Sequence, residues 1–354
     1  MTGEGNQASG IQSGNGVLGD GNQASGTQTG NEVAGLNNLA SGSNSGNGVS
    51  GNNNQASGTG AGNGVSGIDN IAMGAGAGNG VSASATTSIG QNALASNDNA
   101  LAIGTSSSSS GQSSLAFGTS ATATSQDSIA VGTGAQATNT DAIAIGTGAT
   151  SSGAGSIAIG VGATATGSVS MGNNATASDG GTAIGDNTSA TPTNSAAFGN
   201  GAVATLTNQQ VFGTAANTYT MPGITSNLSK ARQSGPLEVV TSDAAGNLAT
   251  DGGQIFSRLD QAAKDADEAK SGVALAISMQ NPDLVSGEKF GVAVNAGFYE
   301  GAEALSVSAQ GVLAQNLFTS GDRLALSGGV GFGFDNGSGD EVVGGRVGAQ
   351  MTWR

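Results

Sequence analysis

The sequence contains no cysteine and no histidine, and only 9 % of its 354 residues are charged. The lack of cysteine excludes disulfide frameworks, thiol nucleophiles and cysteine-based zinc sites. The lack of histidine removes the commonest general base and the commonest metal ligand. We therefore expect neither an enzyme nor a protein that binds a metal or a cofactor.

Positive charge is missing from the first 229 residues, because the first basic residue is Lys230. Nine acids are scattered over the same span: Glu4, Asp20, Glu32, Asp69, Asp98, Asp127, Asp141, Asp179 and Asp186. A surface without cations cannot neutralise phosphates, so nucleic acid is not expected as a partner. We interpret the acids as residues that keep a neutral surface soluble.

Glycine, in contrast, is abundant, with 64 residues, and much of it recurs at a fixed spacing. The segment Ile157-Ala158-Ile159-Gly160 has near-copies whose last residues follow one another at a step of fourteen: Gly90, Gly104, Gly118, Gly132, Gly146 and Gly160. A short fixed period predicts a β-roll in which each repeat forms one turn, stable only when stacked on its neighbours. The predicted roll spans residues 87–213.

In each copy the two large apolar residues share one face of a short strand, since side chains alternate along a strand. The alanine between them, such as Ala158, is small enough for close approach, and we expect it to face a neighbouring chain. The large residues of three central copies are candidates for the core of a trimer: Ile129, Val131, Ile143, Ile145, Ile157 and Ile159.

Residues 1–86 repeat with a different period, sixteen, as in Asn6-Gln7-Ala8-Ser9-Gly10 and Asn22-Gln23-Ala24-Ser25-Gly26. This segment offers few large apolar side chains, so two interpretations compete: a polar roll continuous with the next segment, or a disordered low-complexity tail. The strict spacing over five copies favours the roll.

Residues 214–252 interrupt the repeats and are predicted to be a neck or adaptor, with a strand at Leu237–Thr241, a turn, and a returning strand at Leu248–Thr250. A helix is expected over 253–280, with its C-terminal half inside a barrel. Its apolar and small residues alternate at steps of four and three, the seam of a coiled coil: Ile255, Leu259, Ala262, Ala266, Ala269, Val273 and Ala276.

Residues 285–354 contain four alternating segments, with apolar residues on one face and small or polar residues on the other. Strands of about ten residues with this pattern are typical of outer-membrane β-barrels. The candidate lipid-facing residues are Phe290, Val292, Val294, Leu305, Val307, Leu324, Leu326, Val330, Phe332, Val347, Met351 and Trp353. Asp335–Glu341 resembles a calcium loop only superficially and is expected to be the turn between the last two strands.

Four strands cannot close a barrel, and an open sheet edge is not viable in lipid. Three chains would supply twelve strands, and the heptad helix independently predicts self-association. The predicted fold is therefore mainly β: a trimeric β-roll head of 14- to 16-residue repeats, a short coiled-coil helix, and a four-stranded contribution to a 12-stranded trimeric outer-membrane barrel.

The chain resembles the YadA-like trimeric autotransporter adhesins. The repeats of the form Ile157-Ala158-Ile159-Gly160 match the head repeat of that family, and the segment from about Gly272 to Trp353 matches its membrane anchor. The resemblance implies a homotrimer in the outer membrane, with its head exposed on the cell surface for adhesion. It also implies an anchor that translocates its own passenger and contacts with membrane lipid and the barrel-assembly machinery. The matrix or cell-surface ligand stays unknown.

Two alternatives remain. A trimeric phage or prophage fibre also joins β-rolls to coiled coils, but has no need of lipid-facing strands. A soluble roll that binds ice or another surface would need regular threonine ranks, and the threonine positions drift between repeats.

Overall fold

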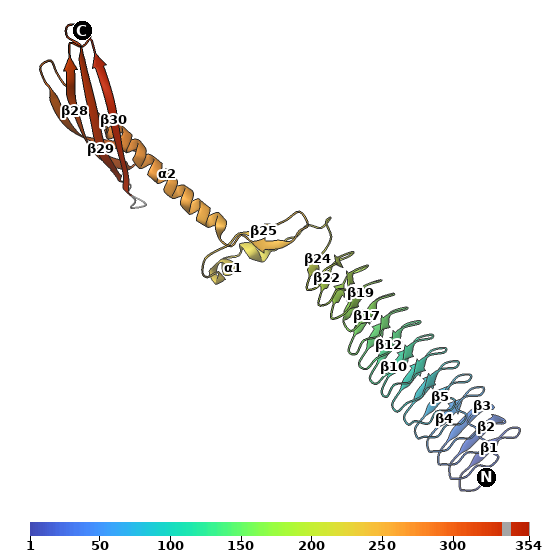
Figure 1. Cartoon of the computed structure of the whole chain (residues 1–354). Coiled ribbons are helices and arrows are strands. Elements are labelled where there is room, and N and C mark those ends of the chain that lie inside the picture. Colours follow the sequence, from blue (N-terminus) through green and yellow to red (C-terminus); the bar gives the residue numbers. More distant parts are fainter. Residues whose placement is uncertain (335–340, 354) are drawn as a thin grey trace. The chain divides into compact units, whose positions relative to one another are not determined.

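The computed structural model describes residues 1–334 and 341–353. The turn expected at Asp335–Glu341 thus falls almost wholly outside the described residues, as does Arg354. The chain divides into two compact units, Met1–Tyr219 and Thr220–Arg354, and each is described by itself (Figure 1).

The first unit is a β-solenoid with two sheets of parallel strands. The larger one, named the long sheet, has fifteen strands: β1 (Gln7–Ser9), β2 (Gln23–Thr27), β3 (Leu39–Ser43), β4 (Gln55–Ser57), β5 (Ile71–Met73), β6 (Thr87–Ile89), β8 (Leu101–Ile103), β10 (Leu115–Phe117), β12 (Ile129–Val131), β14 (Ile143–Ile145), β16 (Ile157–Ile159), β18 (Val169–Met171), β20 (Thr182–Ile184), β22 (Ala196–Phe198) and β24 (Gln210–Phe212). The other, named the short sheet, has nine: β7 (Leu94–Ala95), β9 (Ser108–Ser109), β11 (Thr122–Ala123), β13 (Gln136–Ala137), β15 (Thr150–Ser151), β17 (Thr164–Thr166), β19 (Thr176–Ser178), β21 (Ser189–Ala190) and β23 (Val203–Ala204).

The repeat sets the register of both sheets. Ile157 pairs with Ile143 of the preceding turn and with Val169 of the following one. Equivalent residues therefore stack one above another at a spacing of about 4.8 Å. The prediction of a solenoid with one repeat per turn is confirmed.

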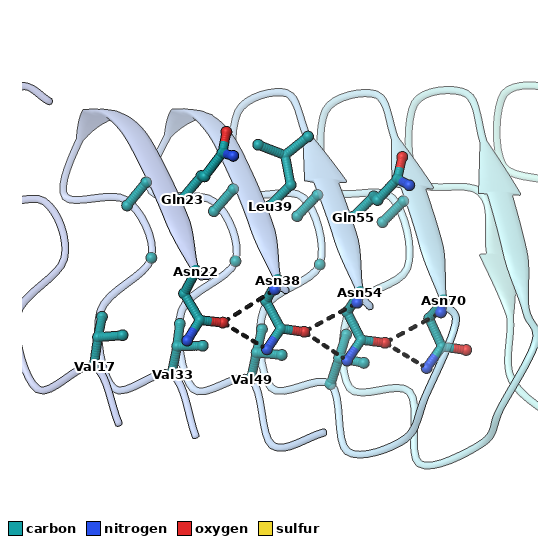
Figure 2. A pocket seen from close by; sticks show the side chains of 18 of the residues that line it. Val17, Asn22, Gln23, Val33, Asn38, Leu39, Val49, Asn54, Gln55 and Asn70 are labelled. Carbon is teal, nitrogen blue, oxygen red and sulfur yellow. Dashed lines mark hydrogen bonds between the residues drawn. The ribbon is translucent and has the colours of Figure 1, made fainter. Parts of the chain in front are cut away.

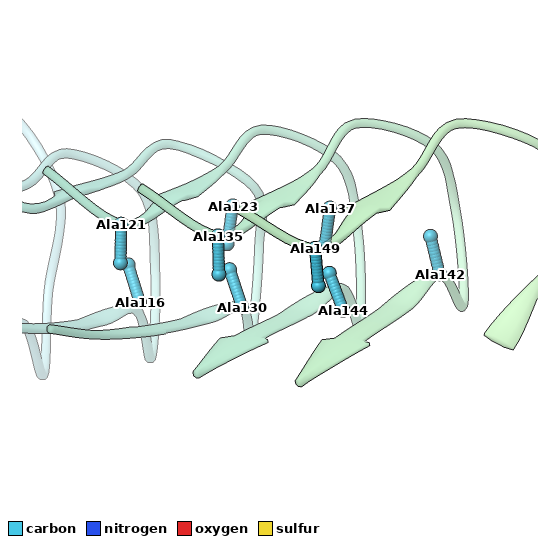
Figure 3. Close-up of a cluster of buried hydrophobic side chains, with 9 residues drawn as sticks. All are labelled: Ala116, Ala121, Ala123, Ala130, Ala135, Ala137, Ala142, Ala144 and Ala149. Carbon is cyan, nitrogen blue, oxygen red and sulfur yellow. The ribbon is translucent and has the colours of Figure 1, made fainter. Parts of the chain in front are cut away.

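The interior of each fourteen-residue turn admits only small side chains. Nine alanines from successive turns point toward one another and are fully buried (Figure 3): Ala116, Ala121, Ala123, Ala130, Ala135, Ala137, Ala142, Ala144 and Ala149. Ala158 is likewise 0 % exposed. The expectation that it faces a neighbouring chain is wrong, because alternation along the strand turns it inward whenever Ile157 and Ile159 point outward.

The sixteen-residue repeats form solenoid turns as well, not a disordered tail. Five valines, one per turn, make up their core: Val17, Val33, Val49, Val65 and Val81. Beside them runs a ladder of buried asparagines, shown in Figure 2. Asn38 donates its side-chain amide to Asn22 Oδ1 (3.0 Å) and to the carbonyl of Gly51 (2.8 Å). The ladder satisfies polar groups that would otherwise be buried without partners.

The second unit begins with short elements: a 3₁₀ turn η1 (Pro222–Thr225), helix α1 (Asn227–Arg232), and an antiparallel pair of strands, β25 (Val240–Ser242) and β26 (Leu248–Thr250). β26 coincides with the predicted returning strand, whereas β25 overlaps the strand predicted at Leu237–Thr241 only in Val240 and Thr241, and α1 was not anticipated. Ser226 begins α1 by accepting a hydrogen bond from the backbone of Ser229 (3.0 Å).

Helix α2 (Gln254–Ser278) precedes a four-stranded antiparallel sheet, the anchor sheet, in the order β27 (Phe290–Tyr299), β28 (Ala302–Gln315), β29 (Arg323–Phe334), β30 (Glu341–Thr352). The pairing is regular except for one register shift between Val312 and Ala314. One face of this sheet packs against the C-terminal half of α2, through a core that includes Ala274 and Leu275. Figure 1 shows the helix leading into the sheet.

The corner glycines generate a first prediction. Gly146 has a φ of +133°, and a Cβ there would lie 2.4 Å from the carbonyl oxygen of Gly160 in the next turn. Gly148, in the same repeat, also has a positive φ (+66°) but meets no atom within 4 Å. Gly148→Ala is expected to cost about 1–2 kcal/mol, the strain of left-handed backbone alone. Gly146→Ala should cost clearly more, because stacked turns must separate. Thermal unfolding of residues 1–219, followed by circular dichroism, measures the difference; equal melting temperatures would contradict it.

Candidate functional site

Large apolar side chains of the solenoid lie on the outer side of the long sheet, in two ranks along its axis. We name the central part of these ranks the apolar stripe; it consists of the first and third residues of β8 to β18: Leu101, Ile103, Leu115, Phe117, Ile129, Val131, Ile143, Ile145, Ile157, Ile159, Val169 and Met171. All twelve are half-buried or exposed, and Phe117 is 50 % exposed. The six candidates for a trimer core belong to this stripe.

The stripe does not extend to the first turns. In β1, β2 and β4 the same two positions carry Gln and Ser, as in Gln23 and Ser25. β3 carries Leu39 at one of them, and both positions first become apolar in β5, with Ile71 and Met73. The outer face of the long sheet is therefore polar in its first turns and apolar in its central ones.

The short sheet presents a different surface. The threonines by themselves do not recur at one fixed position, as the sequence suggested. However, the outward position directly after the buried residue of each strand is occupied by Ser or Thr in every turn of this sheet: Ser96, Ser110, Thr124, Thr138, Ser152, Thr166, Ser178, Thr191 and Thr205. No member of this rank is charged. The solenoid thus has one neutral hydroxyl face and one apolar face.

The predicted seam of helix α2 is exposed along its whole length: Ile255, Leu259, Ala262, Ala266, Ala269, Val273 and Ala276. The face of α2 that packs on the anchor sheet is another one, made by Ser271, Ala274, Leu275 and Ser278. This second face was missed because it contains two serines and only one large apolar residue, so no hydrophobic periodicity marks it.

The other side of the anchor sheet carries the predicted lipid-facing residues. Ten are exposed: Phe290, Val292, Val294, Leu305, Val307, Leu326, Val330, Phe332, Val347 and Trp353. Leu324 and Met351 are half-buried. Val347 is the most exposed of these residues, at 90 %. Together they form a broad apolar face that no other element of the described residues covers.

Asp251 joins the neck hairpin to helix α2. Its carboxylate accepts hydrogen bonds from the backbone N–H groups of Ile255 (2.7 Å), Val239 (2.8 Å) and Gly253 (3.1 Å). These bonds, that of Ile255 foremost, lower the pKa of Asp251 below its ordinary value. The ionised carboxylate takes the capping role at the positive end of α2, since Gly253 has no side chain to do so.

A family model for the YadA head domain repeat matches residues 82–107, 109–135, 137–163 and 179–202. All four stretches lie in the solenoid, and the first three contain β8 to β16, which carry ten of the twelve residues of the apolar stripe. The central part of the solenoid therefore consists of YadA head domain repeats.

Among solved structures, the collagen-binding domain of the Yersinia adhesin YadA is similar to this YadA-like chain at 20 % sequence identity. The alignment covers 55 % of this chain and 86 % of that domain, with a TM-score of 0.29. A TM-score this low does not establish a common arrangement of the whole head. The curated proteins contain no match.

Each unit contains a cavity to consider as a site for a small ligand. The cavity between the buried valines and asparagines of the solenoid, drawn in Figure 2, has a volume of only about 20 Å³. In the second unit a polar cavity of about 120 Å³ lies between Pro282, Gln310 and Arg323. Within the described residues, no group of three or more acidic side chains could hold a metal ion. No described helix combines the length and the apolar character needed to cross a membrane.

Proposed function

We propose that this YadA-like adhesin works as a homotrimer in the outer membrane, with the solenoid displayed on the cell surface and the anchor sheet embedded in lipid. The observation that carries the proposal is the division of the anchor sheet into an exposed apolar face and a face of small and polar residues against α2. Alternation of this kind is what a membrane strand needs. A phage fibre, the alternative, has no use for it.

Trimerisation follows from the edges of the anchor sheet. β27 and β30 each pair with one neighbour only among the described strands, so each keeps a free edge. Unpaired backbone groups are not tolerated in lipid, where they cost several kcal/mol each, so the sheet must close on further copies. Three copies supply twelve strands, within the range of even-numbered bacterial barrels. Their lumen would receive one helix from each chain.

The head requires partners for a separate reason. Its turns are too narrow to enclose large side chains, so the apolar stripe stays on the surface of a single chain. Burial of apolar area contributes about 25 cal/mol per Å². Packing three stripes against one another would gain this energy, and the exposed seam of α2 would continue the association below the head.

Adhesion and secretion complete the proposal. The head would bind a matrix, cell-surface or abiotic ligand through uncharged contacts that repeat along many turns, and other copies of itself on neighbouring cells. The barrel would translocate the passenger during assembly, with the barrel-assembly machinery as its partner. In this account the protein is not an enzyme and needs no cofactor.

The stripe assignment is tested by a matched pair of charge substitutions. Ile145 lies on the apolar stripe, whereas Gln136 is exposed on the short sheet of the preceding turn. Ile145→Glu should destabilise the trimer of residues 1–219 by several kcal/mol, because three carboxylates would be buried without partners. Gln136→Glu should leave it unchanged. Sedimentation equilibrium gives the association constants, and circular dichroism checks that both variants fold. Trimers of equal stability would contradict the assignment.

Adhesion is tested by a binding panel with the trimeric head, residues 1–219. We expect binding to at least one uncharged matrix or surface, and none to heparin or DNA, because the head has no Lys or Arg. Binding should weaken little as salt rises, since no counterions are released from the ligand. A steep loss of binding with salt, or binding to a polyanion, would contradict this account of the surface. Failure to bind any ligand would leave self-association as the function of the head.

A further inference from the structure

Helix α2 ends in a set of hydrogen bonds that the anchor function does not by itself require. The last carbonyl groups of a helix have no partner within the helix. Here three successive carbonyls accept hydrogen bonds from side chains of the anchor sheet. Ser306 donates to Ser278 O (2.7 Å), Arg346 donates to Met279 O, and Asn295 donates to Gln280 O (3.1 Å) together with Ser308. These donors come from β27, β28 and β30.

Packing against the same face fixes how closely the helix approaches. A Cβ at Gly297 would lie 2.1 Å from the carbonyl oxygen of Ala274, and one at Gly333 would lie 2.8 Å from that of Ser271. At Gly331 and Gly344 a Cβ would collide with Leu275, at 2.5 and 2.9 Å. Because these positions carry no side chains, they form a shallow surface on the anchor sheet, the seat, against which the last turns of α2 pack.

The seat accepts only one register of the helix. A shift of one turn would bring Asp267 and Lys270 toward the positions that Ser271 and Ala274 occupy, because residues three and four apart share a helix face. Their charges would then lie in a seat built for small neutral groups, at a high desolvation cost. A shift in the other direction would bring Pro282 into the helical turn, which proline disfavours.

Arg346 adds an electrostatic element. Among the described residues, it is the one charged residue that donates a hydrogen bond to these three carbonyls, and the C-terminus of a helix carries a partial negative charge. A hydrogen bond from a charged donor is stronger than one between neutral groups. The neutral donors Ser306, Ser308 and Asn295 fix position, whereas Arg346 contributes most of the attraction.

We propose that Arg346, with Ser306, Ser308 and Asn295, is the stop that holds the last turn of the passenger in the barrel once secretion is complete. The inference rests on the proposed function, since it assumes that the anchor sheet lines a lumen. Arg346 acts here as a positioning residue: it fixes which turn of α2 fills the lumen and thereby keeps the pore closed. The stop operates after translocation, because only then does the carbonyl group of Met279 reach the side chain of Arg346.

The test uses the full chain, produced in the outer membrane of a Gram-negative host, extracted in detergent and inserted into planar lipid bilayers. Trimer in unheated gel samples reports the proposed function, and ion conductance reports whether α2 fills the lumen. We expect Arg346→Ala to keep the trimer and to raise the open probability of the pore by about tenfold to a hundredfold, the factor for losing a hydrogen bond to a charged group. Arg346→Lys should restore part of the closure. Arg258→Ala, an exposed arginine in the first half of α2, is the matched control and should behave as the parent.

The outcomes separate the two proposals. A parent chain that forms no trimer would overturn the proposed function. A parent trimer together with an Arg346→Ala trimer that is equally closed would overturn the stop alone. If Arg346→Ala fails to assemble, Arg346→Lys and Ser308→Ala test the stop instead, because each keeps at least one hydrogen-bond donor to the last carbonyl groups of α2. Conductance equal to that of the parent in both would then overturn the stop.

Discussion

The constraint on which this structure depends is the width of one solenoid turn. Fourteen residues enclose room for alanine and serine, but not for isoleucine or phenylalanine. Apart from Val211 in the last turn, the large apolar residues of the strands in these turns therefore point outward, where a single chain leaves them half-buried or exposed. The interior supplies register through stacked backbones, and a single chain gains little energy from apolar burial; in the proposed trimer, contacts between chains supply it. The repeat builds a solenoid that is regular by itself but leaves an apolar face uncovered on a single chain.

The anchor sheet repeats the same distribution of side chains in another setting. Glycine and serine occupy one face, so that helix α2 can pack closely against it. Large apolar residues occupy the other face, which stays exposed in a single chain. In each unit, the small residues thus make the contacts within the chain. The large residues face away from the chain, and in the proposed function they meet a second copy in the head and lipid in the anchor.

Much of this fold could be read from spacing alone. The steps of fourteen and sixteen fix one repeat per turn, and alternation of period two places Ile157 and Ile159 on one face. What spacing could not decide was on which side of the strand the solenoid interior lies, and so Ala158 was assigned to the wrong side. The turn is too short to enclose the larger pair, and that volume argument, not periodicity, gives the answer.

Other features could not be identified from the sequence pattern. The asparagine ladder depends on side-chain amides that reach across turns, and an asparagine every sixteen residues reads equally well as a turn residue. The face of α2 that meets the anchor sheet consists of Ser271, Ala274, Leu275 and Ser278, which no hydropathy pattern marks. Its position is set by glycines on strands that follow much later in the sequence. Contacts of this kind become visible only when the two elements are placed together.

The most direct test of the central claim, that both units are completed by three copies, is the mass of the complex extracted from membranes without heating. Native mass spectrometry in detergent is predicted to give three copies of the 33.5 kDa chain as the only assembled species. The same sample should show protection of the apolar stripe from hydrogen exchange relative to the short sheet. A stable complex of one or two copies would contradict the account.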